Sequence, residues 1–133
     1  MWNSKLNTHT LLSTLWLFVV VNFFARDIHE LGRPGMLEQV MSGVVDGVVI
    51  TEGLMLVGGI MFEIPILMIL LSVVLCRAIN RCVTVVAALM TLAIIAINNM
   101  QPDLDNIFFM VIQIAALIAI IRIAWVWKEE SRA

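Results

Sequence analysis

The stretch GLMLVGGIMFEIPILMILLSVVL, residues 53–75, decides the fold of this chain. At about 1.5 Å per residue, a helix of this length crosses the ~30 Å hydrocarbon layer of a bilayer. A carboxylate at the middle of such a helix costs roughly 2.5–3.5 kcal/mol on insertion scales. We therefore expect Glu63 to be paired with another group, to be protonated or to serve a function. Pro65 has no amide hydrogen and frees the carbonyl of Met61, which predicts a bend. The sequence therefore predicts a transmembrane helix with a polar point at its centre.

Glu52, Gly59 and Glu63 lie on one face of this predicted helix. Intervals of seven and eleven residues return a side chain to within about 20° of its starting direction. The glycine on that face allows another helix to approach closely. Two interpretations stay open: Glu63 hydrogen-bonds two helices together, or it serves a site for a proton, an ion or a ligand.

The composition is that of a membrane protein. The 133 residues are 62% hydrophobic and 14% charged, with a mean hydropathy of +1.03, whereas soluble domains are about half apolar and a quarter charged. Four spans with short connections use nearly all of this length, which predicts an all-α, integral membrane four-helix bundle. We predict a single domain, 1–133, with spans at residues 10–28, 53–75, 83–98 and 107–127.

Several classes of partner and cofactor are excluded by the residue types. A formal net charge of −2 supplies no basic surface for nucleic acid. Cys76 and Cys82 form no C-x-x-C pair and no zinc-type cluster, so we predict neither a metal site nor thiol redox chemistry. His9 and His29 lie outside the span interiors, where axial ligands of a membrane haem are expected. The sequence names no cofactor.

The segment between the first two spans has its own structure. Gly32, Pro34 and Gly35 break the first helix, and residues 36–41 are typical of a single helical turn. Residues 44–49, VVDGVV, carry β-branched residues on both sides of Asp-Gly, the signature of a short β-hairpin. We expect this outer loop to fold onto the bundle as a lid.

Ionisable residues gather where the first span ends, and five of them are candidates for an outer polar cap: Arg26, Asp27, His29, Glu30 and Arg33. Arg26 and Glu30 make an i,i+4 pair on one helical face. One interpretation is a solvated helix end with ordinary ion pairs. The other is a preorganised polar cap over the bundle.

The order of these motifs resembles a known family. Residues 26–31, RDIHEL, are followed by RPG at 33–35, TEG at 51–53 and EIP at 63–65. This pattern resembles a family of small four-span membrane proteins of unknown function, and the similarity covers most of the chain. The resemblance implies a four-span bundle in which the first loop and second span share a polar feature, and it implies no activity. A weaker likeness to DoxX-type proteins rests on architecture alone.

Candidate residues for a ligand or ion site between the helices are Glu63, Glu52, Asn98 and Gln113. Asn98 follows Thr84 and Thr91 at intervals of seven, a spacing that equally suits close helix packing. The first functional hypothesis is a binding or permeation module for protons, cations or a small ligand. The alternative is an accessory or structural subunit of a larger membrane complex. A third, an enzyme acting on a quinone-like lipid through His29, Asp27 and Arg26, has no nucleophile or cofactor motif behind it.

Lysine and arginine predict the orientation. The first side of the bilayer holds Lys5, Arg77, Arg81, Lys128 and Arg132, with Arg122 at its edge, and the second holds Arg26 and Arg33. The positive-inside rule then places both termini in the cytoplasm. With no organelle signal visible, we expect a bacterial inner membrane. The predicted partners are the lipid bilayer and either further copies of the chain or another membrane protein.

Overall fold

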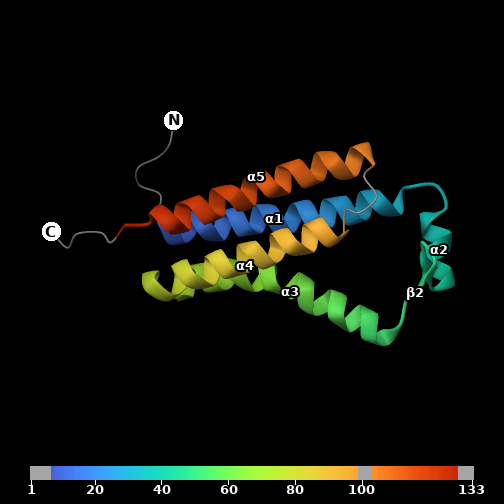
Figure 1. Cartoon of the computed structure of the whole chain (residues 1–133), viewed down its shortest axis with the longest axis horizontal. Coiled ribbons are helices and arrows are strands. Elements are labelled where there is room, and N and C mark those ends of the chain that lie inside the picture. The colour runs from blue at the N-terminus through green and yellow to red at the C-terminus, as the bar shows by residue number, and fades with distance from the viewer. Residues whose placement is uncertain (1–6, 99–102, 129–133) are drawn as a thin grey trace.

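The computed structural model describes residues 7–98 and 103–128. Within these ranges, the long helices run up and down beside one another (Figure 1): α1 (Thr8–Leu31), α3 (Glu52–Val74), α4 (Arg77–Asn98) and α5 (Leu104–Val126). All four are long and apolar enough to cross a membrane. α1 and α4 each lie against both α3 and α5. The predicted all-α four-helix bundle is confirmed.

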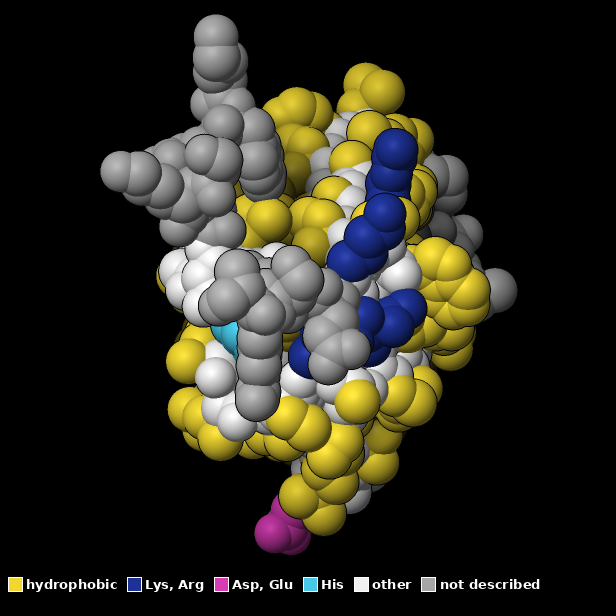
Figure 2. Space-filling view, turned by 90° about the vertical axis from the view of Figure 1, so that its left-hand side faces the viewer, with side chains coloured by type: hydrophobic (Ala, Val, Ile, Leu, Met, Phe, Trp, Pro, Cys, Tyr) yellow, Lys and Arg dark blue, Asp and Glu magenta, His cyan; other side chains and the backbone are white. Residues whose placement is uncertain are grey.

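The two ends of the bundle differ in chemistry. We call the end where α1 begins and α5 finishes the termini end, and the opposite one the loop end. Figure 2 views the termini end, where Lys and Arg side chains gather; among the described residues, the acidic side chains seen in this view lie at its lower margin. The described basic residues whose helix positions place them at this end are Arg77, Arg81, Arg122 and Lys128.

Arg77 and Arg81, which lie between the predicted spans 53–75 and 83–98, belong to the first turns of α4 and bind the end of α5. Arg77 donates from Nε and Nη2 to the carbonyl oxygen of Trp127 at 3.2 and 2.7 Å. Arg81 donates from Nε to the carbonyl of Ala124 at 2.9 Å and from Nη2 to that of Trp125 at 2.8 Å. The last carbonyls of a helix lack internal partners and carry its negative dipole end, so cationic donors stabilise them. The two arginines thus join α4 to α5.

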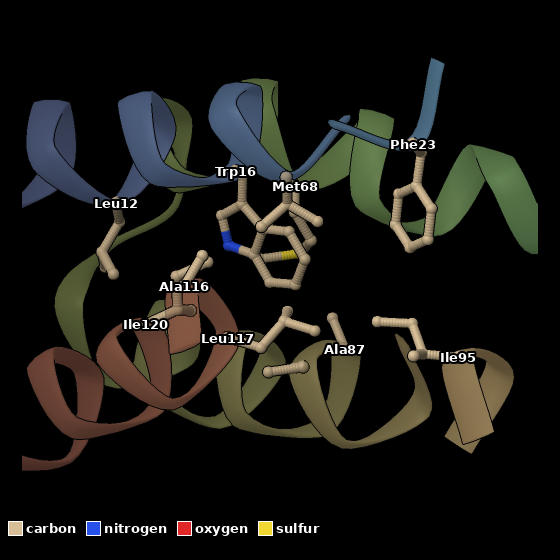
Figure 3. Packing of buried hydrophobic residues seen from close by; sticks show 11 residues of the cluster. Leu12, Trp16, Phe23, Met68, Ala87, Ile95, Ala116, Leu117 and Ile120 are labelled. Carbon is tan, nitrogen blue, oxygen red and sulfur yellow. The ribbon is translucent and has the colours of Figure 1, made fainter. Parts of the chain in front are cut away.

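The core lies between the four helices and is built around Trp16. This side chain is fully buried on α1 and points between Met68 of α3 and the side chains of α5 (Figure 3). α4 contributes the small buried residues Ala87 and Ala88, and small residues let membrane helices approach closely. Leu12, Trp16, Val19, Leu117 and Ile120 have no exposed surface.

The loop between α1 and α3 contains α2 (Met36–Ser42), β1 (Val44–Val45) and β2 (Val48–Val49). Val44 pairs with Val49 and Val45 with Val48 in antiparallel register. Asp46 and Gly47 both have positive φ, 49° and 81°, as a two-residue type I′ turn requires. The predicted short helix and hairpin are therefore confirmed.

The first half of α3 runs away from the other helices toward the loop (Figure 1). Thr51 caps its start, accepting a hydrogen bond from the Leu54 amide at 3.1 Å. Residues 52–57 are all exposed, and Pro65 is the first buried position along the helix. α3 therefore packs on the bundle mainly through its second half.

Candidate functional site

A polar cleft of about 640 Å³ opens at the loop end, between the bundle and the loop. It is lined by Arg26, Asp27, Glu30, Leu31, Arg33, Met36, Val40, Val45, Asp46, Val48, Ile97, Asn98 and Asn106. We call this the loop-end cleft. Its volume lies within the range of small-molecule sites, roughly 300–1,000 Å³. Of the predicted polar cap, four residues line it: Arg26, Asp27, Glu30 and Arg33.

Among the ion-paired residues at the loop end, Arg26 has the least exposed side chain. Its side chain is 17% exposed, and its Nε donates to Oδ1 of Asn106 on α5 at 3.1 Å. Nη1 lies 3.9 Å from Asp27 Oδ1, beyond hydrogen-bond distance. Among the residues that the structure describes, the two Nη nitrogens make no hydrogen bond. They leave donors of a fixed geometry at the wall of the loop-end cleft.

Arg33 joins three separate segments. Its Nη2 lies 2.7 Å from Glu30 Oε1 on α1 and 4.0 Å from Asp46 Oδ2 in the hairpin turn. Its Nη1 donates to Asp103 Oδ2, next to α5, at 2.9 Å. With three carboxylates around one guanidinium, this positive charge is already compensated. Arg33 is therefore a structural tie between the loop and the bundle.

His29, the fifth residue of the predicted cap, does not line the cleft. Its Nε2 lies 3.3 Å from Asp105 Oδ2, and its side chain is 60% exposed. Its ring is also 5.9 Å from that of Phe109. These contacts hold the end of α1 beside the start of α5, which suits the interpretation of a solvated helix end.

The four residues predicted for a site between the helices are not brought together in a buried position. Glu52 and Glu63 are exposed on α3, and Asn98 is exposed where it lines the loop-end cleft. Gln113 is buried in the bundle, and its Nε2 has no hydrogen-bond partner among the described residues. Gln113 therefore lies inside the bundle, whereas both glutamates lie on its surface.

Two features of the site were missed by sequence reasoning. Asn106, which orients Arg26, lies just before the fourth predicted span, 107–127, and is not among the predicted site residues, although an amide in the first turn of an apolar helix is a signal for a buried partner. The apolar wall of the cleft comes from α2 and the hairpin, through residues such as Met36 and Val45. Only the position of the loop reveals that wall.

A second polar cluster is buried at the termini end. Asn80 Nδ2 donates to the carbonyl of Ser72 at 2.8 Å, and its Oδ1 accepts from Thr84 Oγ1 at 3.0 Å. His9 Nδ1 lies 2.9 Å from the Ser72 carbonyl oxygen and 3.3 Å from Asn80 Nδ2. The His9 ring meets that of Trp127 edge-on at 4.6 Å. These contacts join all four long helices at this end.

Within residues 7–98 and 103–128, no group of three or more His, Cys, Asp or Glu side chains is placed to hold a metal ion. Cys76 and Cys82 are exposed free thiols.

The fold and the cleft define a class: small proteins of four long helices, each apolar enough to span a membrane, with a polar cleft at one end of the bundle. The chain belongs to the family of unknown function DUF6326, whose model matches residues 1–133. No curated protein and no solved structure matches it. The predicted membership of a four-span family of unknown function is confirmed, whereas the likeness to DoxX-type proteins is not.

Proposed function

We propose that this protein binds a small amphipathic molecule in the loop-end cleft, with a hydrogen-bond acceptor of that molecule held by Arg26. One observation carries the proposal: a guanidinium only 17% exposed, fixed by Asn106, with both Nη groups left without hydrogen bonds among the described residues. A partly buried cation with spare donors favours an acceptor such as a carboxylate, phosphate or carbonyl.

The rest of the cleft suits the apolar part of such a molecule. Beside its charged residues, the cleft is lined by apolar ones: Leu31, Met36, Val40, Val45, Val48 and Ile97. Ligand sites typically combine a mainly apolar lining with a few placed polar groups. At the loop end, a molecule already dissolved in the bilayer surface can enter with its polar group leading.

The packing favours binding over permeation. Between the loop-end cleft and the termini end, the bundle is filled by side chains with no exposed surface, including Trp16, Leu117 and Ile120. A protein interior packed in this way holds no water column. A single copy of the chain therefore offers a site at one end, rather than an aqueous path for protons or cations.

Photolabelling tests the proposal with two probes of equal length and opposite polarity. The protein in lipid nanodiscs is exposed to a diazirine-bearing decanoate or the matching decylamine, and labelled peptides are mapped by mass spectrometry. We expect decanoate to label the end of α1 and the loop, and decylamine to label them much less. Arg26→Gln is expected to lower decanoate labelling roughly tenfold or more, since hydrogen bonds to charged groups contribute about 1.5–3 kcal/mol.

Arg122→Gln is the matched control, because Arg122 is exposed near the opposite end of the bundle. It removes the same charge and is expected to leave labelling unchanged. Equal labelling of the native protein and the Arg26 variant, or stronger labelling by decylamine, contradicts the proposal.

An accessory or structural subunit is the second candidate function. It is favoured by the first half of α3, where residues 52–57 are all exposed and the helix runs away from the other long helices (Figure 1). Native mass spectrometry after gentle extraction separates the two functions. A particle with unrelated subunits supports the accessory role, and a particle of this chain with a retained amphiphile supports binding.

A further inference from the structure

Glu63 occupies an unexpected position for an acidic residue. It lies at the middle of α3 and is exposed on the outer surface of the bundle. Among the residues described, it makes no hydrogen bond and no ion pair. In a bilayer this face meets hydrocarbon, which offers a carboxyl group neither donor nor acceptor. Something outside the single chain is therefore needed to satisfy Glu63.

The surroundings of Glu63 form a continuous helix-packing face. Four residues share one face of α3: Leu56, Gly59, Glu63 and Leu70. With Ile66 between the last two, they are spaced three or four residues apart, as in the seam between two packed helices. Leu56 and Leu70 are 65% and 61% exposed. A Cβ atom added at Gly59 meets no other atom of the chain within 4 Å. We call these four residues the α3 face.

The positions of the charged residues indicate which group of a second copy can meet Glu63. The described cationic side chains lie toward the ends of the bundle, with Arg26 and Arg33 at the loop end and Arg77, Arg81, Arg122 and Lys128 at the termini end. None of these described cations lies at the mid-helix depth of Glu63. Two copies inserted in the same orientation are related by an axis along the membrane normal, which places equal residues at equal depth. The group that meets Glu63 at its own depth is then Glu63 of the second copy.

A carboxyl group suits a two-fold contact because it is self-complementary. In its protonated form it donates one hydrogen bond and accepts another, so two such groups satisfy each other across the axis. An isologous interface needs a patch that complements itself in this way. Gly59 lowers the barrier to close approach one turn away, as small residues do in membrane helix pairs.

We propose that a second copy of this chain covers the α3 face, with the two Glu63 carboxyl groups hydrogen-bonded to each other at the centre of the membrane. The contact uses α3 alone and leaves the loop-end cleft open on each copy. The association is thus independent of the proposed ligand site.

Cysteine cross-linking in native membranes tests this arrangement. In a Cys76→Ser, Cys82→Ser background, Gly59→Cys puts one thiol on the α3 face, and Ile118→Cys puts one on an exposed face of α5 as the matched control. A short bifunctional maleimide is expected to join the Gly59→Cys protein into dimers at least tenfold more than the Ile118→Cys protein. Equal cross-linking at both positions overturns the proposal.

Glu63 itself is tested in the Gly59→Cys protein. Glu63→Gln keeps both a donor and an acceptor and is expected to retain at least half of the dimer, whereas Glu63→Leu is expected to lose about tenfold. An unchanged thermal transition of each variant shows that the bundle still folds. Undiminished dimer in Glu63→Leu overturns the role of the carboxyl pair, and cross-linking to an unrelated protein overturns the choice of a second copy. Decanoate labelling of the loop-end cleft is expected to be unaffected in all these variants, so the two proposals fail separately.

Discussion

Asn80 shows how a single buried amide holds the termini end together. It has no exposed surface, and it links the end of α3 to α4 through its bonds with the Ser72 carbonyl and the Thr84 hydroxyl. His9 of α1 shares the same carbonyl oxygen. Removing a buried donor strands its partners, which costs more than the bond itself contributed.

Replacing Asn80 by Leu is expected to destabilise the protein by about 1–2 kcal/mol, since an apolar side chain of similar size leaves these polar groups with fewer partners. Unfolding in mixed micelles, followed by circular dichroism, measures the loss. Asn22→Leu is the control: among the described residues, Nδ2 of Asn22 donates only to the Phe18 carbonyl of its own helix, and a smaller loss is expected. If both variants unfold alike, the buried network contributes little.

At the scale of elements, arginines at the start of α4 complete the end of α5. In the sequence, Arg77 and Arg81 lie between two predicted spans; in the structure, they cap the C-terminal end of α5. α3 and α4 are joined through only Leu75 and Cys76. That short connection places the first turn of α4 beside the last carbonyls of α5. The cap thereby acts between helices that are neighbours in space.

Arg81→Gln is expected to loosen the last turn of α5 by about 0.3–1 kcal/mol, the usual contribution of a cation at a helix C-terminus. Amide hydrogen exchange of residues 122–126 should accelerate roughly two- to fivefold, while exchange in the middle of α5 stays as it was. Arg122→Gln removes a charge from α5 itself, but Arg122 makes none of these hydrogen bonds, so this variant is expected to change amide exchange less. Equal acceleration in both variants would show that charge alone, rather than the cap, is responsible.

At the scale of the whole molecule, the excess of Lys and Arg at the termini end predicts that this end faces the cytoplasm and that the loop end faces the other side of the membrane. Cys76 lies between α3 and α4 at the termini end and is exposed. In intact cells, a membrane-impermeant maleimide is expected to miss Cys76 and Cys82 until the membrane is permeabilised. Asp46→Cys, in a background lacking both native cysteines, should be labelled without permeabilisation. The reverse pattern would place the termini outside.

Much of the architecture could be predicted because each span depends on local composition. Twenty or so apolar residues make a helix wherever they lie, and Asp-Gly between valine pairs makes a type I′ hairpin from its own backbone preferences. The candidate site was harder to predict. The cap residues Arg26, Asp27, Glu30 and Arg33 were found because they are close in sequence, whereas Asn106 was missed because it is 80 residues from Arg26.

The sequence by itself determined the number of helices, the loop between α1 and α3, and the presence of an acid at the middle of α3. Only the tertiary structure decided which way that acid faces. Helical periodicity fixes which residues share a face, as with Gly59 and Glu63, but the rotation of a helix about its axis depends on packing with its neighbours. In α3 that packing buries Pro65 and Met68 and leaves Glu63 on the outside. On α1, packing against α5 likewise places Arg26 beside Asn106, at the wall of the cleft that we propose binds a ligand.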